Sequence, residues 1–159
     1  MKVFISHKRE DQGIALAVES AFKLQHVDTY LDVLDSNLST GSEALTKRIR
    51  TELNHCTDII VVISKLTKLS WWVPFEIGMS AQIDMPTASF LSSDETLPSY
   101  LSYWPRLTSI SQIQTYVDTR KRVKKQILHE DAALEHTIYA SQRRNETAEF
   151  YRQLKQALR

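Results

Sequence analysis

The sequence predicts a three-layer α/β domain built around a mostly parallel sheet of five strands. Short runs rich in β-branched residues alternate with segments of helical periodicity, and the connections between them are short. The run "DIIVVIS" (58–64) shows no polar alternation, which is typical of a central parallel strand covered on both faces. At 159 residues, with 42% of them hydrophobic, the chain is long enough to form one domain with a buried core.

The first half of the chain contains three expected strands and two expected helices. The strands are predicted at Lys2–Ser6, 27–33 and 58–64. A loop rich in Ser, Asp and Asn ends at Ser42, which begins the second helix. The helices are indicated by apolar positions three and four residues apart, namely Ile14, Ala17, Val18, Ala21 and Phe22 in the first and Leu45, Ile49, Leu53 and Cys56 in the second.

The second half continues the alternation. A helix is predicted from near Trp72, because Pro74 is tolerated only in a first helical turn. Strands are expected at 86–91 and 106–110, and a further helix at 111–127. The last segment, 145–159, is predicted to be a helix with an apolar stripe made of Phe150, Tyr151, Leu154 and Leu158, which we expect to pack on the domain or to serve a partner contact.

Composition and charge exclude several classes of protein. A formal net charge of +1 supplies no long-range field for nucleic acid or an anionic membrane. Cys56 is the only cysteine, so no intramolecular disulfide is possible and a reducing cytoplasm is expected. The longest aliphatic run, 59–63, is far shorter than the roughly 20 residues of a membrane span, and the N-terminus does not have the pattern of a signal peptide.

Several familiar site motifs are missing. The chain has only three glycines, so neither GxGxxG nor a phosphate-binding P-loop can be formed. The segment "HEDAALEH" (129–136) resembles a zinc-binding HExxH helix, but Ala133 stands where the second histidine is needed, and we expect no metal. The basic run "RKRVKK" (120–125) has no interleaved aromatic residues and is predicted to be a solvated helix face.

Glu76 is the most unusual residue of the chain. At 100° per residue it falls within the apolar arc of the helix that begins near Trp72. A carboxylate there is poorly solvated, which costs free energy unless something binds it. Helix geometry alone leaves two interpretations open, a functional carboxylate or a structural one bound by a backbone amide or an arginine. The expected arc consists of Trp72, Phe75, Met79 and Ile83 on one side of Glu76 and Val73, Ile77 and Ala81 on the other.

Three segments, in this order, resemble the Toll/interleukin-1 receptor (TIR) domain family. They are "KVFISHKRED", "TYLDVLDSNLSTGSEALTKRIRTELNHCTDIIVVIS" and "SWWVPFEIGMSA", and the last carries W-x-x-x-E at Trp72 and Glu76. The resemblance covers about residues 2–128 and implies a flavodoxin-like α/β/α fold. It divides the chain into a TIR domain at 1–128 and a helical extension at 129–159 packed on the same domain. It also implies the stand-alone prokaryotic type that cleaves NAD+, as in Thoeris antiphage defence.

The resemblance implies a site for cleavage of the nicotinamide–ribose bond of NAD+. Glu76 would be the catalytic carboxylate, with NAD+ as the substrate and no cofactor. His7 departs from the tyrosine that is common at its position, which puts in doubt a ring contact there. The implied substrate-binding residues are His7, Lys8, Arg9, Asp32, Trp71 and Trp72. The implied BB loop, which in relatives mediates assembly, comprises Asp35, Ser36, Asn37, Leu38, Ser39, Thr40 and Gly41.

Two other functions remain open at this stage. A non-catalytic TIR adaptor would act through TIR–TIR assembly, whereas a nucleoside deoxyribosyltransferase-like enzyme would also use a buried Glu at a ribose. For the NAD+-cleaving enzyme the implied partners are copies of the chain itself and a separate effector reached by a diffusible nucleotide. The sequence does not decide whether the product is ADP-ribose, a cyclic isomer or a base-exchange conjugate.

Overall fold

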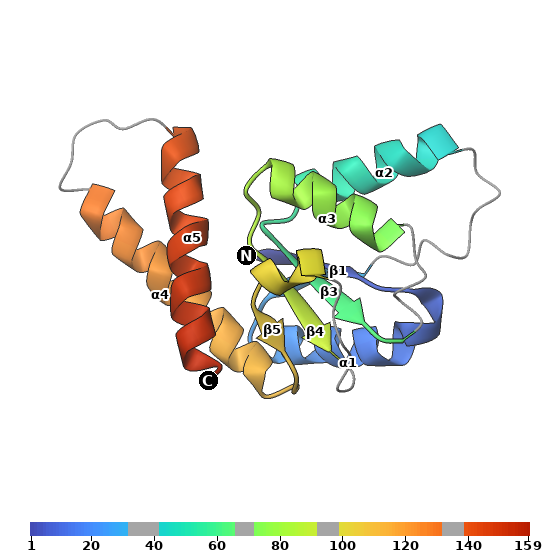
Figure 1. The fold of residues 1–159 in the computed structure, drawn as a ribbon, viewed down its shortest axis with the longest axis horizontal. Coiled ribbons are helices and arrows are strands. Elements are labelled where there is room, and N and C mark those ends of the chain that lie inside the picture. The colour runs from blue at the N-terminus through green and yellow to red at the C-terminus, as the bar shows by residue number, and fades with distance from the viewer. Residues whose placement is uncertain (32–41, 66–71, 92–98, 132–138) are drawn as a thin grey trace.

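The chain folds around a central parallel sheet of five strands, in the order β2-β1-β3-β4-β5, as a computed structural model shows (Figure 1). The structure describes residues 1–31, 42–65, 72–91, 99–131 and 139–159. This confirms the predicted α/β class and the parallel sheet. The strands are β1 (Lys2–Ser6), β2 (Asp28–Leu31), β3 (Asp58–Ile63), β4 (Thr87–Leu91) and β5 (Arg106–Leu107).

The third strand lies at the centre of the sheet, as its apolar run at 59–63 predicts. All six residues of β3 are buried. Its neighbours are β1 and β4, with Ile60 in register with Ile5 on one side and with Ala88 on the other. Side chains of a strand alternate between the two faces, so a strand covered on both faces is largely apolar, here from Ile59 to Ile63, and its one charged residue, Asp58, is buried with hydrogen-bond partners.

The fifth strand is shorter than predicted, because the chain turns into the next helix at once. Gln112 explains the difference. Its side-chain Oε1 accepts hydrogen bonds from the backbone N–H of Thr108, at 2.7 Å, and of Ser109, at 3.3 Å. These bonds satisfy amides that would otherwise continue the strand ladder, so β5 ends at Leu107.

Helices cover both faces of the sheet. One apolar cluster joins α2 and α3 to sheet residues such as Phe4 and Val61, and the other joins α1, α4 and α5 to residues such as Ile5 and Val62. Figure 1 shows α2 and α3 on one side of the sheet and α1 on the other. The helices are α1 (Gln12–Leu24), α2 (Ser42–Asn54), α3 (Trp72–Gln82), α4 (Gln112–Asp131) and α5 (Tyr139–Ala157).

The buried stripes of α1 and α2 follow the predicted spacing with one correction. Ala15 is buried in α1, whereas Ala17, predicted in the stripe, is exposed. The apolar arc of α1 is wider than its contact with the sheet, so composition could not choose between the two alanines. In α2, Ile49 and Leu53 are buried as predicted, and the side chain of Leu45 lies outside the described residues.

The C-terminal helix packs on the domain through its predicted stripe. Phe150 and Leu154 are fully buried, and the Phe150 ring lies 5.0 Å from that of Tyr116. The Tyr151 hydroxyl accepts a hydrogen bond of 2.9 Å from the backbone N–H of Thr87. Helix α5 begins earlier than predicted, and α4 continues past residue 128, so the division at 128/129 remains a prediction.

Two helices end in left-handed residues that return the chain to the sheet. His26 has φ 56° and follows α1, and Asp84 has φ 51° and follows α3. In both places the next residue donates its N–H five positions back, from Val27 to Phe22 and from Met85 to Ser80. This is the Schellman arrangement, which satisfies carbonyl groups at a helix end.

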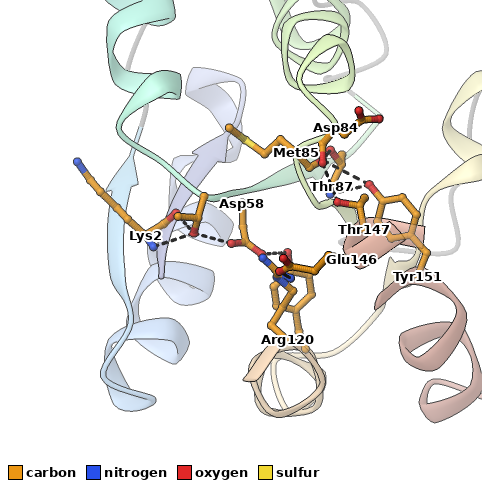
Figure 2. A network of polar contacts seen from close by, with 11 residues as sticks. Lys2, Asp58, Asp84, Met85, Thr87, Arg120, Glu146, Thr147 and Tyr151 are labelled. Carbon is orange, nitrogen blue, oxygen red and sulfur yellow. Dashed lines mark hydrogen bonds and ion pairs between the residues drawn. The ribbon is translucent and has the colours of Figure 1, made fainter. Parts of the chain in front are cut away.

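The basic run on α4 is not wholly a solvated face, because Arg120 is only 9% exposed. Its Nε donates to Asp58, at 2.6 Å, and its second nitrogen, Nη1, to Glu146, at 2.8 Å (Figure 2). Tyr116 and Thr57 also donate to Asp58. Burial by itself would lower the pKa of Arg120, but Asp58 beside it raises that pKa above its ordinary value. The prediction of a solvated face was therefore wrong at Arg120.

The described helices include none that is both long and apolar enough to cross a lipid bilayer.

Candidate active site

Glu76 lies on the buried face of α3, close to the carboxyl edge of the sheet. Its side chain is 2% exposed, as the helical periodicity predicts. The buried face of α3 consists of Val73, Glu76, Ile77 and Ser80, which is the three- and four-residue spacing of one helix side. Phe75, predicted in the apolar arc, is 39% exposed, and Ala81 is also exposed. The predicted arc was therefore too wide at Phe75 and Ala81, whereas Met79 and Ile83 are partly buried against the core as predicted.

Ser6 is the hydroxyl partner of Glu76. Its Oγ donates a hydrogen bond to Oε2 of the carboxylate, and both side chains are buried. Ser6 is the last residue of β1, so the strand ends where α3 presents its acid. A hydroxyl group partly replaces the water that burial removes, which lowers the cost of placing a carboxylate there.

A second serine and carboxylate pair lies at the same edge of the sheet. Ser64, directly after β3, donates to Oδ2 of Asp11 at 2.8 Å, and both residues are buried. Asp11 ends the short 3-10 helix that follows β1, so this bond ties the β1–α1 connection to the end of the central strand. The carboxyl ends of parallel strands meet at one edge of a sheet, where α/β proteins commonly bind their ligands.

The sequence interpretation missed Ser6, Asp11 and Ser64. Each Ser is the last residue of a predicted strand, and adjacent parallel strands bring such positions together. That signal is available from sequence once the strand order is known. The strand order itself depends on tertiary contacts, which cannot be read from the sequence.

The predicted substrate residues that follow β1 lie along this same edge. His7 is buried at 9% exposure, directly after Ser6. Lys8 is partly exposed, and its Nζ lies 3.3 Å from Oε1 of Glu10. Arg9 is exposed and opens the 3-10 helix. A backbone hydrogen bond, with help from Lys8, lowers the pKa of Glu10. A surface pair of this kind contributes little stability, so Lys8 can exchange Glu10 for another anion.

The remaining predicted residues are not placed by the structure. Asp32, Trp71 and the BB loop at 35–41 lie outside the described residues. Trp72 begins α3, but its side chain is not described. These positions stay predictions, and the described part of the site consists of Ser6, His7, Lys8, Asp11, Ser64 and Glu76 together with exposed Arg9.

The described arrangement is suited to stabilising a positive charge that forms during a reaction. A carboxylate in a poorly solvated site interacts with a nearby cation more strongly than one in water. Lys8 and Arg9 occupy a loop at the same edge, where they can meet an anionic part of the same substrate. An acid in the interior and cations on the rim together fit a substrate that carries phosphate and develops positive charge elsewhere.

Comparison with known proteins agrees with this fold. A family model described as a TIR domain matches residues 3–137. A solved structure described as a 2-deoxyribosyltransferase from the psychrotolerant bacterium Bacillus psychrosaccharolyticus is similar, with a TM-score of 0.59 and 12% sequence identity. The similarity covers 71% of this chain and 90% of that one, and at this identity it concerns the fold alone. No curated protein matches the chain.

Proposed function

Because this chain belongs to the TIR domain family, we propose that it is an enzyme that cleaves the bond between nicotinamide and ribose in NAD+. The observation that carries the proposal is Glu76, a carboxylate with 2% exposure at the carboxyl edge of a parallel sheet. This edge is where open α/β sheets bind their ligands. Its rim carries Lys8 and Arg9, which are suited to the pyrophosphate of the substrate.

The chemistry uses a buried carboxylate in a direct way. The bond between ribose C1′ and the nicotinamide nitrogen breaks, and both electrons go to nitrogen, which loses its positive charge. The ribose is left as an oxocarbenium-like cation, as in glycoside hydrolysis. Glu76 stabilises that cation or binds the ribose hydroxyls, and its poor solvation strengthens the interaction. Ser6 holds the carboxylate in place through the hydrogen bond that it donates.

The acceptor at C1′ decides the product. Water attacks C1′, loses a proton and gives ADP-ribose, whereas an internal nucleophile gives a cyclic isomer and an amine or imidazole gives a conjugate. We favour a signal molecule, which acts in the cytoplasm on a separate effector in antiphage defence. The BB loop at 35–41 would mediate the self-association of the domain.

The decisive experiment measures nicotinamide release from NAD+ by chromatography and mass spectrometry. We expect the wild-type protein, at concentrations high enough for self-association, to release nicotinamide, and Glu76→Gln to stop it. Glu52→Gln, the same chemical change near the end of α2 at the opposite edge, is the matched control and should keep the wild-type rate. Circular dichroism should confirm that all three proteins are folded.

Other results would select another function. Equal nicotinamide release by wild type and Glu76→Gln would refute the role of Glu76. Base exchange on 2′-deoxynucleosides without turnover of NAD+ would favour a deoxyribosyltransferase, the activity in the description of the similar structure. Assembly without turnover of either substrate, and unaffected by Glu76→Gln, would favour a TIR adaptor.

A further inference from the structure

A cavity of about 550 Å³ lies at the amino edge of the sheet, opposite to Glu76. Its lining includes Thr57, directly before β3, and Pro86, directly before β4. Ser6 and Ser64, which mark the site of Glu76, stand at the other ends of β1 and β3. The length of the sheet therefore separates the cavity from the candidate active site. Its volume falls in the range of about 300–1,000 Å³ that is usual for pockets binding small molecules.

The cavity has an apolar wall. Leu53, Cys56 and Met85 line it and are buried in the core, with exposures of 3%, 7% and 4%. Burial raises the pKa of the Cys56 thiol to about 11, so this side chain is neutral near pH 7 and is part of the apolar surface. A flat apolar group that covers these residues gains free energy from the water it displaces.

The opposite wall carries an excess of positive charge. Lys121 and Lys124 line the cavity from α4 and are exposed. Within the described part of the chain, neither ammonium group has a hydrogen-bond or ion-pair partner. They are three positions apart, so they lie on one side of the helix and can reach one ligand together.

Arg120 adds a third cation to this wall, already partly neutralised. Asp58 and Glu146 are its hydrogen-bond acceptors among the described residues, and they occupy two of its five N–H groups (Figure 2). Glu146 also lines the cavity and is the carboxylate of its lining. The charged side chains of the lining are therefore three cations and one anion, so an anionic ligand is favoured over a cationic one.

We propose that this cavity binds a small organic anion with a flat apolar body and a phosphate or carboxylate group. The apolar body lies against Leu53, Cys56 and Met85, and the anionic group meets Lys121 and Lys124. The cavity lies between the amino edge of the sheet and helices α4 and α5. Because residues of both helices line the cavity, an occupant stabilises their packing against the sheet.

The test uses 1-naphthyl phosphate and 1-naphthoate as probes, with 1-naphthalenemethanol as the neutral analogue. Binding is measured by calorimetry and located by two-dimensional NMR of the labelled full chain. We expect a Kd of about 1 mM or tighter for the anions and at least about tenfold weaker binding of the alcohol. The amide signals of Thr57, Met85 and Lys124 should shift. Tighter binding of 1-naphthyl phosphate than of 1-naphthoate would identify a dianion as the preferred ligand. Equal binding of the two probes would identify a simple anion.

A pair of variants tests the role of the lysines. Lys124→Ala should weaken binding of the anions about tenfold. Lys125→Ala removes the same charge from an exposed neighbour that does not line the cavity, and should change binding by less than about twofold. Both positions are exposed, so neither variant threatens folding. The proposal would be overturned if both variants weakened binding equally or if the alcohol bound as tightly as the anions. It would also be overturned by NMR shifts confined to residues near Glu76, or by no binding at 10 mM probe, which is about tenfold above the expected Kd.

Discussion

The two edges of the sheet both bury a carboxylate, but they bind it with different groups. At the amino edge, Asp58 accepts hydrogen bonds from the guanidinium of Arg120, from Tyr116 and from Thr57. At the carboxyl edge, Glu76 accepts from the hydroxyl of Ser6, and Asp11 from that of Ser64. The difference shows that burial of an acid does not by itself indicate a functional site.

The ion pair of Asp58 and the serine hydrogen bond of Glu76 suit different roles. A guanidinium at 2.6 Å binds Asp58 strongly and joins β3 to α4 and, through Glu146, to α5. Such an ion pair is difficult to open, so Asp58 is suited to holding the fold together. The Ser6 hydroxyl is a neutral donor that orients Glu76, which suits a carboxylate that must respond to charge on a substrate. The comparison leads to predictions that separate stability at one edge from activity at the other.

The largest effect is expected from Asp58→Asn. The change removes one of the two carboxylates that compensate the charge of the buried Arg120, and leaves only Glu146. We therefore expect the free energy of unfolding to fall by about 3 kcal/mol. Urea denaturation measures it. Glu146→Gln, at the partly exposed end of the same network, should cost less, about 1 kcal/mol. A loss under Asp58→Asn no larger than that under Glu146→Gln would contradict the structural role of Asp58.

The sequence predicted one of these acids and not the other, for a physical reason. Glu76 was recognised because helical periodicity fixes which residues share a face, and this is a local property. The burial of Arg120 depends on Asp58, which is 62 positions away, and its hydrogen bond is a product of tertiary packing. A basic run by itself looks solvated, and only the position of its helix against the sheet shows otherwise.

The same limit applies to the candidate site. Ser6 is 70 positions from Glu76, and Ser64 is 53 positions from Asp11. Strand boundaries were predicted well where the apolar run is long, as in β3, and less well in β5, where a side chain of α4 ends the strand. Periodicity therefore predicts which residues are buried, while partners across the fold require the topology.

The second largest effect is expected from alkaline pH, which should reduce the free energy of unfolding through two groups at the amino edge. Burial raises the pKa of Cys56 from 9.0 to about 11 and that of Tyr151 from 10.0 to about 12. Because the folded pKa is the higher one, each contribution is complete below the ordinary pKa and is lost as pH rises through the folded value. Each group contributes at most about 3 kcal/mol, and about 2 kcal/mol of the Cys56 contribution is lost by pH 10.5. Urea denaturation of the wild type at pH 8 and pH 10.5 measures the loss.

Cys56→Ala provides the control for this pH dependence. The variant lacks the thiol and should lose less stability than the wild type between the same two pH values, whatever its stability at pH 8. Cys56 precedes β3 and Tyr151 contacts Thr87 at the start of β4, so both groups belong to the amino edge. An identical pH dependence in wild type and variant would show that the thiol is not desolvated in the folded protein.

Ser6→Ala should produce a smaller loss of stability and a clear loss of activity. Removing one hydrogen-bond donor from a buried carboxylate costs about 1 kcal/mol, measured by urea denaturation. Nicotinamide release should fall about tenfold, since Glu76 is no longer held in one orientation. Ser20→Ala is the control and should leave release unchanged, because the Ser20 hydroxyl bonds the Leu16 carbonyl on the exposed side of α1. Full activity in Ser6→Ala would remove Ser6 from the proposed site.

The smallest effect concerns the turn by which α1 returns the chain to the sheet at the amino edge. His26 has φ 56°, a conformation that costs a side chain about 1–2 kcal/mol and costs glycine nothing. His26→Gly removes that cost but makes the unfolded chain more flexible, so we expect a net gain of about 0.5 kcal/mol in the free energy of unfolding. Gln25→Gly, one position earlier at φ −91°, has no such strain to relieve and should be destabilising. If both variants lose stability equally, the left-handed residue is not strained. A gain in stability for His26→Gly with unchanged nicotinamide release places the strain at the amino edge, away from Glu76.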